Sequence, residues 1–337
     1  MGKEKEMIDL INRHMPRSPK QINQPFQADA EIIQFMESTL LYNIDEFSEE
    51  DLFRDNDPYV LGWNMAAGTI SDILASGGSP KFYAHSLTAC HSWGENYLEL
   101  LAPGIGAGLK ETGTAFIGGD FGVSSVWRYT GSVIGELNGS PLLRSEAKIK
   151  EKIFLSGPVG RGNLEAALKM YADHKFITKM TGTWKNYFPL RYREAEIIKK
   201  YSRCCIDTSD GVFNALNTIS EMSGTGFVVN RLPYIKSGLM LAKALHLPEE
   251  MMFFGECGEY ELLFTVSREN EAAFFQEAEN KKMNFYPIGA VAEEGKKILR
   301  GKAGEIDLTG FNLKARDYAK IKEDVRDLAD FLKRRPT

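Results

Sequence analysis

Hydrophobic and polar positions follow two patterns along this chain, one typical of strands and one typical of helices. Residues 126–137 (VWRYTGSVIGEL) alternate like a strand, whereas 59–76 has the pattern of a helix that is stopped by Gly77 and Gly78. Helices and strands therefore alternate in both halves, which predicts an α/β (α+β) fold. Further helices are predicted at 3–14, 94–112, 163–173, 193–201, 210–222, 236–246, 268–281 and 314–335, and further strands at 40–45, 83–89, 114–120, 152–156, 204–206, 226–230, 261–266 and 285–291.

The length and one polar segment predict two domains. A chain of 337 residues is most naturally two domains of ordinary size. The segment NGSPLLRSEAK (138–148) interrupts the pattern, which starts again with a new strand after it. We therefore predict domains at 1–145 and 146–337. No repeat of 20–50 residues is visible, which excludes solenoids and propellers.

Composition excludes several classes of partner. The 41 basic and 46 acidic residues leave a net charge of −5, which does not favour a nucleic-acid partner. The chain has no apolar run of 18 residues, and its N-terminus is charged without the apolar stretch of a signal peptide, so no membrane association is expected. The four cysteines form no CxxC pair. These features predict a reduced, cytoplasmic protein.

The familiar phosphate-loop and nucleophile motifs are absent. No GxxxxGK[ST] occurs, GPVGRGN (157–163) lacks the lysine, and GIGAG (104–108) is not GxGxxG. This disfavours a P-loop kinase and a dinucleotide-dependent dehydrogenase. There is no GxSxG, and none of the five histidines is paired at metal-ligand spacing, so a catalytic histidine is not expected.

Aspartates at the ends of predicted elements are the strongest chemical signal. Asp45, Asp120 and Asp207 each end a predicted strand, Asp210 opens the next helix, and Asp72 lies near the glycines that end a helix. Any one of them alone could be a helix cap. Carboxylates gathered together repel one another unless a cation neutralises them, and Mg²⁺ with a phosphate ligand is the usual solution. The set therefore predicts a magnesium–phosphate site.

DTSDGVFNAL (207–216) and GECGEYELLFTV (255–266) are the most specific motifs in the chain. They resemble motifs of the thiamine-monophosphate kinase family, within the aminoimidazole-ribonucleotide synthetase-like superfamily. The resemblance covers roughly residues 25–315 in order. Weaker matches are ISDILASGGSP (70–80), FIGGD (116–120), LLRSEAKIKEKIFLSG (142–157), YPIGAV (286–291) and LTGFNLKARDY (308–318).

This resemblance implies a two-domain synthetase-like fold, with an N-terminal sheet domain that forms a homodimer interface and a C-terminal α/β domain. It also implies transfer of the γ-phosphoryl group of ATP, with Mg²⁺, to a small-molecule phosphate substrate, thiamine monophosphate. Asp210 supports the metal cluster and Arg144 clamps phosphate in this interpretation. The implied metal ligands are Asp29, Asp45, Asp72, Asp120 and Asp207; the implied ATP contacts are Asp45, Gly118, Gly119, Asp120, Arg144 and Ser209; the implied substrate contacts are Glu259, Tyr260 and Phe311.

Some positions depart from the family pattern. Ala28 replaces one of two paired aspartates, Phe121 follows the Gly-Gly-Asp turn where a small hydroxyl residue is usual, and residues 256–259 alter the Gly-Gly-Glu/Asp-Asp stretch. Two alternatives therefore stay open. One is an aminoimidazole-ribonucleotide synthetase-related, ATP-dependent enzyme with another substrate, and the other is a degenerate member that binds nucleotide without turnover.

Overall fold

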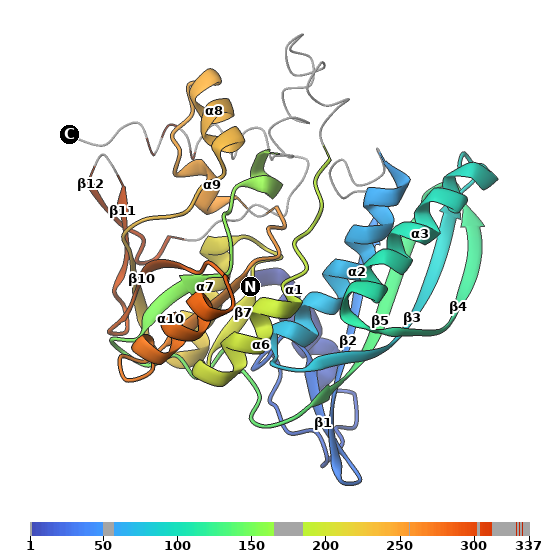
Figure 1. The fold of residues 1–337 in the computed structure, drawn as a ribbon, viewed down its shortest axis with the longest axis horizontal. Coiled ribbons are helices and arrows are strands. Elements are labelled where there is room, and N and C mark those ends of the chain that lie inside the picture. The colour runs from blue at the N-terminus through green and yellow to red at the C-terminus, as the bar shows by residue number, and fades with distance from the viewer. Residues whose placement is uncertain are drawn as a thin grey trace.

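The structure, a computed structural model, describes residues 2–49, 57–164, 185–255, 257–301 and 304–311, together with Leu328, Asp330 and Leu332 near the C-terminus. Two β-sheets form its framework, one from the N-terminal and one from the C-terminal half of the chain, with helices packed against both (Figure 1). This confirms the predicted α/β class. The predicted domain boundary at residue 145 lies between the two sheets and stays a prediction.

The N-terminal sheet has five strands in the order β1-β2-β5-β3-β4, and only the β3–β4 pair is parallel. Its helices α2 and α3 lie together along one face of the sheet (Figure 1). The two helices can approach closely because Gly62 and Gly104 have no side chains. A side chain at Gly62 would collide with the backbone of Leu101, and one at Gly104 would collide with the backbone of Tyr59. The elements are β1 (Glu31–Phe35), β2 (Ser38–Ser48), α2 (Pro58–Ala75), β3 (Ser79–Cys90), α3 (Glu95–Thr112), β4 (Ala115–Ser124) and β5 (Arg128–Leu137).

The C-terminal sheet has seven strands in the order β12-β11-β8-β10-β6-β9-β7. Every residue of β9 is buried, because α6 and α10 cover one face of the sheet and α7 and α9 the other. The strands are β6 (Lys152–Leu155), β7 (Cys205–Asp207), β8 (Gly226–Val229), β9 (Leu262–Val266), β10 (Tyr286–Ala292), β11 (Lys297–Gly301) and β12 (Gly304–Asp307). The helices are α6 (Tyr192–Tyr201), α7 (Val212–Ser223), α8 (Lys236–Ala244), α9 (Met251–Phe254) and α10 (Glu271–Asn280).

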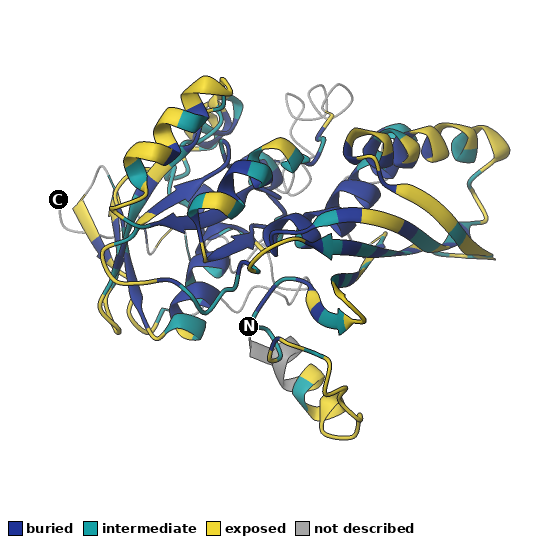
Figure 2. Cartoon of the chain, turned by 60° about the horizontal axis from the view of Figure 1, so that its bottom comes forward, coloured by how far each residue is buried: buried dark blue, intermediate teal, exposed yellow. Residues whose placement is uncertain are grey.

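One hydrophobic cluster joins the two halves. It runs from Ile70 on α2 and Tyr129 on β5 to Phe264 on β9 and Phe274 on α10. The dark interior in Figure 2 continues from one sheet to the other. Helix α1 (Gly2–Asn12) lies outside this body and exposes Ile11. No helix among the described residues is long and apolar enough to cross a membrane.

Most predicted elements are present, and two strand ends were predicted wrongly. Asp45 lies within β2, which continues to Ser48, and Asp120 lies within β4, which continues to Ser124. The two glycines do not end β4 because its pairing with β3 continues past them, with a register shift at Gly118, whose φ is 144°. Strands β1, β11 and β12 and the short helix α9 were not predicted from the sequence pattern. Predicted helices 163–173 and 314–335 lie almost entirely outside the described residues.

Candidate active site

Three aspartates from distant parts of the chain meet between the two sheets. Asp29, Asp72 and Asp207 each present one carboxylate oxygen, and these oxygens lie within 4.8 Å of one another. Asp29 lies just before β1, Asp72 is on α2, and Asp207 is the last residue of β7. The site therefore needs both halves of the chain.

Helix α2 places Asp72 by burying almost everything else on it. The helix begins at Pro58, where the Asp57 carboxylate accepts the backbone N–H groups of Tyr59 and Val60. Along the rest of the helix nearly all residues are buried, and Asp72 is half-buried. A carboxylate in such surroundings requires compensation by a proton, a cation or a hydrogen-bond donor.

Burial raises the pKa of all three carboxyl groups. Burial raises the pKa of Asp29 to about 7, although the Arg144 charge opposes this rise. Burial also raises the pKa of Asp72 well above its ordinary value, and the negative charges of Asp207, Asp29 and Asp45 add to the effect. The pKa of Asp207 is raised by burial as well. A divalent cation among them would favour the ionised forms of all three.

Hydrogen bonds orient two of these carboxylates and leave one oxygen unpaired. The Asp207 carboxylate accepts hydrogen bonds from Ser71 Oγ at 2.7 Å and from Ser209 Oγ at 2.7 Å. Arg144 donates through Nε, at 3.0 Å, and through Nη2 to Oδ1 of Asp29. Asp29 Oδ2 is buried and has no hydrogen-bond partner within the described structure. An orphaned carboxylate oxygen in an all-oxygen cluster fits a hard cation such as Mg²⁺.

The other predicted metal and nucleotide residues are distributed unevenly around this cluster. Asp45 is half-buried on β2, and its charge acts on Asp72. Asp120 is exposed on the edge strand β4 beside Gly118 and Gly119, and in the described residues of this single chain it is not a member of the cluster. Ser209 bonds directly to Asp207. The metal role of Asp120 stays a prediction.

Asp210 does not cap the helix that follows it, and Arg144 pairs with a cluster carboxylate. Asp210 is exposed, and the residue that caps α7 is Gly211, so Asp210 is not the helix cap. The Arg144 guanidinium is already bonded to Asp29, and its side chain is 17% exposed. Arg144 therefore positions a cluster carboxylate, and its role as a phosphate clamp stays a prediction.

The predicted substrate residues are enclosed by the chain itself. The buried Glu259 carboxylate accepts the backbone N–H of Arg161 at 2.9 Å, and burial raises its pKa to about 8. The Tyr260 ring stacks on Phe188, with ring centroids 4.0 Å apart, and Phe311 packs on Phe254. Their substrate roles stay predictions.

Comparison with known proteins places the chain in a family. Models of the N-terminal and C-terminal domains of AIR synthase related proteins match residues 27–137 and 190–302, which together make up more than half of the chain. The thiamine-monophosphate kinase of Bacillus subtilis (strain 168) is 30% identical over 279 residues, covering 79% of this chain and 82% of that one. The chain belongs to the thiamine-monophosphate kinase family of AIR synthase related proteins.

Other members of this family are similar over greater lengths. The thiamine-monophosphate kinase of Pyrococcus horikoshii is 29% identical over 312 residues, covering 89% of this chain and 94% of its own. The solved structure of thiamine monophosphate kinase from Aquifex aeolicus superposes with a TM-score of 0.70 at 24% identity, over 90% of this chain and 98% of that one. A structure of AaThiL complexed with AMPPCP and TMP has a TM-score of 0.73 at 23% identity, over 89% and 94% of the two chains. These likenesses establish the shared fold.

Sequence reasoning missed two groups that support the site in this family member. Ser71 bonds to Asp207, and the only sequence signal for it is that it directly precedes Asp72. Arg191 donates to the buried carboxylate of Glu261, with 2.6 Å between Nε and Oε2. No local pattern indicates this second contact, because the partners are 70 residues apart.

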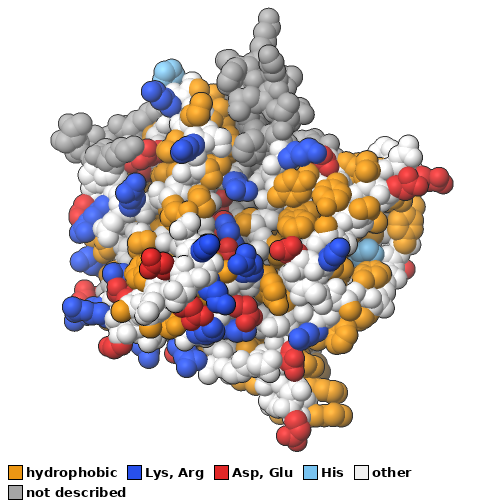
Figure 3. Space-filling view, viewed as in Figure 1, with side chains coloured by type: hydrophobic (Ala, Val, Ile, Leu, Met, Phe, Trp, Pro, Cys, Tyr) orange, Lys and Arg blue, Asp and Glu red, His pale blue; other side chains and the backbone are white. Residues whose placement is uncertain are grey.

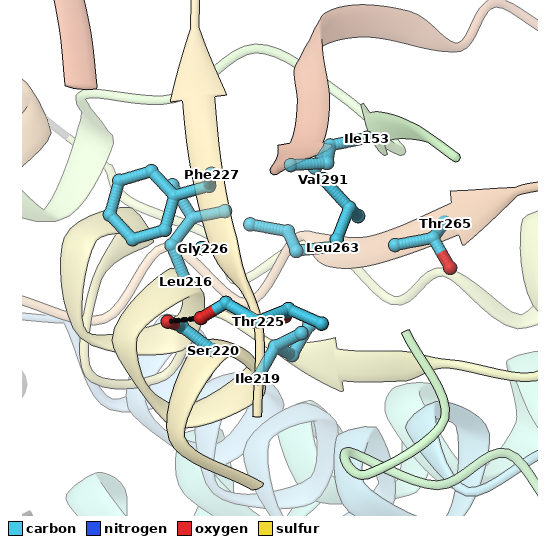
Figure 4. A pocket seen from close by; sticks show the side chains of 10 residues that line it. All are labelled: Ile153, Leu216, Ile219, Ser220, Thr225, Gly226, Phe227, Leu263, Thr265 and Val291. Carbon is cyan, nitrogen blue, oxygen red and sulfur yellow. Dashed lines mark hydrogen bonds between the residues drawn. The ribbon is translucent and has the colours of Figure 1, made fainter. Parts of the chain in front are cut away.

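The cavity in Figure 4 is not a substrate site. It lies between α7 and the C-terminal sheet, and its lining includes Ile153, Leu216, Phe227 and Leu263. Its volume of about 10 Å³ is near the minimum for one water molecule. The carboxylate cluster is therefore the better candidate for chemistry.

Proposed function

We propose that this protein transfers the γ-phosphoryl group of ATP to the phosphate of thiamine monophosphate, giving thiamine diphosphate and ADP. The observation that carries the proposal is the inter-sheet cluster of Asp29, Asp72 and Asp207 in a chain whose curated relatives are thiamine-monophosphate kinases. In the reaction, a phosphate oxygen of the acceptor forms a bond to the γ-phosphorus. The bond from that phosphorus to the bridging oxygen of ADP breaks.

The residues at the site suit this chemistry. Asp29, Asp72 and Asp207 would hold Mg²⁺, with Asp45 close by and Asp120 as a further predicted ligand. When bound, Mg²⁺ neutralises charge on the phosphate oxygens. Arg144 holds Asp29 in place and the hydroxyls of Ser71 and Ser209 hold Asp207.

No strong general base is required. A phosphate monoester has a second pKa of about 6, so its attacking oxygen is already ionised near neutral pH. Phosphoryl transfer depends chiefly on positioning and charge stabilisation. The absence of a nucleophile motif from the sequence therefore agrees with the proposed reaction.

We also propose a homodimer formed through the N-terminal sheet. Large apolar side chains are exposed on the edge strand β4, on its neighbour β3 and on β2 in the same sheet, and Figure 3 shows hydrophobic side chains gathered on the half of the molecule that carries α3 and β4. An exposed apolar edge strand favours association. Asp120 lies on the same strand and would then face the interface. The exposed residues are Ile44, Phe82, Phe116, Ile117, Phe121 and Val123.

A coupled assay with ATP, Mg²⁺ and thiamine monophosphate tests the proposed reaction, with thiamine diphosphate measured directly. We expect turnover in the wild type, and a loss of at least about a hundredfold in Asp72→Asn if the carboxylate stabilises the transition state. Glu99→Gln, an exposed carboxylate on the neighbouring helix α3, is the control that keeps activity.

Two other outcomes would contradict the substrate assignment. Nucleotide binding without thiamine diphosphate formation, together with a thermal shift by another phosphorylated metabolite, would favour a different acceptor. Nucleotide binding with no turnover of any acceptor would favour a degenerate member.

The proposal also includes a cytoplasmic location. Fractionation of the producing cells tests it.

A further inference from the structure

A segment without regular secondary structure, residues 186–191, is held against α2 by side chains instead of by a neighbouring strand. Asn64 Nδ2 donates to the backbone oxygen of Asn186 at 2.8 Å, and Asn64 Oδ1 accepts the backbone N–H of Phe188 at 2.8 Å. Trp63 Nε1 donates to the backbone oxygen of Phe188 at 2.9 Å. One buried amide therefore pairs with two backbone groups of this segment, which we call the strap.

The strap continues to the loop before β9. Its Phe188 ring stacks on Tyr260 at an interplanar angle of 25°, and its Arg191 donates to Glu261. Glu261 also accepts a hydrogen bond from Ser156 Oγ at 2.7 Å. Tyr260 has a φ of 53°, a left-handed conformation that a non-glycine residue adopts only when its surroundings hold it there. The strap supplies one side of those surroundings.

The same loop is bonded to the residue next to Asp207. The backbone N–H and the Oγ1 of Thr208 both donate to the backbone oxygen of Glu261 at 2.9 Å. In return, the Glu261 backbone N–H donates to Thr208 Oγ1 at 2.9 Å, and the Glu259 backbone N–H donates to the Thr208 backbone oxygen. Any shift of this loop therefore moves the turn that carries Asp207.

Both ends of this chain of contacts return to α2. Asn64 and Ser71 are seven residues apart, about two helical turns, so they project from the same side of the helix. Asn64 holds the strap, and Ser71 bonds to Asp207 at the other end. The two routes form a closed loop through α2, the strap, the β9 loop and the Asp207 turn.

We infer that the strap sets the position of Asp207 relative to Asp29 and Asp72, and that Asn64 and Trp63 are positioning residues for the metal cluster. The inference rests on the proposed function, because it takes the cluster to be a metal site. The competing interpretation is ordinary packing between the two halves of the chain. Ordinary packing would change stability when disturbed, but not the affinity of the folded protein for a cation.

Binding of Mn²⁺, measured by calorimetry without nucleotide, separates these interpretations. Trp63→Phe removes the indole hydrogen bond to the strap and shortens the ring that packs edge-on against Tyr187, and Asn64→Leu removes both amide hydrogen bonds. The matched control is Trp127→Phe, because Trp127 Nε1 is buried and has no hydrogen-bond partner in the described structure. Folding of each variant is checked by circular dichroism before titration.

We expect the wild type and Trp127→Phe to bind Mn²⁺ equally, and Asn64→Leu to bind about tenfold more weakly, the range seen when groups that orient metal ligands are removed. Trp63→Phe should weaken binding in the same direction, and it decides the outcome if Asn64→Leu does not fold. Folded strap variants with wild-type affinity would overturn the inference. A wild type that binds no Mn²⁺ would instead refute the metal site of the proposed function, and the strap inference with it.

Discussion

The Asp29–Arg144 pair offers the sharpest test of how the cluster is built. The Asp29 side chain is 1% exposed and that of Arg144 is 17% exposed, so neither is well solvated. Arg144→Met keeps much of the apolar stem but removes the charge and both hydrogen bonds to Asp29. The variant leaves a buried carboxyl group beside Asp72 and Asp207 without the one cationic partner that it has among the described residues.

The magnitude follows from this burial. Removing one partner of a buried ion pair costs 3–5 kcal/mol in general, and we expect about 3 kcal/mol here. The lower end applies because the pKa of Asp29 is already about 7, so the carboxyl group can take up a proton and limit the penalty. Asp29→Asn combined with Arg144→Met removes both charges and should recover most of the lost stability.

Urea unfolding of the metal-free protein at pH 7, followed by tryptophan fluorescence, measures this double-mutant cycle. The four proteins are the wild type, Arg144→Met, Asp29→Asn and the double variant. A coupling free energy of about 2 kcal/mol or more between the two positions is the expected result. A coupling below about 0.5 kcal/mol, as for exposed pairs, would show that the buried pair does not stabilise the cluster, and the reasoning would fail.

Four further predictions concern the carboxylate cluster, the metal and the dimer. Protons compete with Mg²⁺ for the carboxyl groups of Asp29 and Asp72, because the pKa of each is raised. The rise in Tm that Mg²⁺ produces should therefore be larger at about pH 8 than at about pH 6.5, and it should be absent in Asp72→Asn. An equal rise at both pH values would contradict the metal assignment. Without metal, the free energy of unfolding should fall as the pH rises from about 6.5 to about 8, because the native carboxyl groups still hold protons that the unfolded chain has already released. Asp120→Asn should fold normally yet need roughly tenfold more Mg²⁺ for ATP turnover, and an unchanged Mg²⁺ dependence would make this aspartate structural. Phe121→Lys on the exposed strand β4 should shift the protein from dimer to monomer in size-exclusion chromatography with light scattering, whereas Lys110→Gln at the end of α3 should not.

Local pattern was sufficient for most elements and for one part of the site. The largely apolar run of β9 and the helical spacing of α2 are visible in the sequence because both elements are buried on nearly all sides. Asp207 ends a short strand and precedes a glycine-opened helix, so a ligand-binding turn could be predicted there. The short strands β1, β11 and β12 were missed, because strands of four or five residues at the margin of a sheet carry little periodic signal.

The sequence by itself determined the fold class, the family and the aspartates that could bind a metal, since these depend on motifs and on periodicity within short windows. Only the tertiary structure decided which aspartates meet. Asp29 and Arg144 are 115 residues apart, and Ser71 and Asp207 are 136 apart, so their contacts depend on how the two sheets pack. Asp120, like Asp207, was predicted to end a strand. It lies instead within the exposed edge strand β4, whose pairing with β3 continues through Gly118 and Gly119. Long-range packing, which no short window encodes, therefore selects the site from the candidates that the sequence supplies.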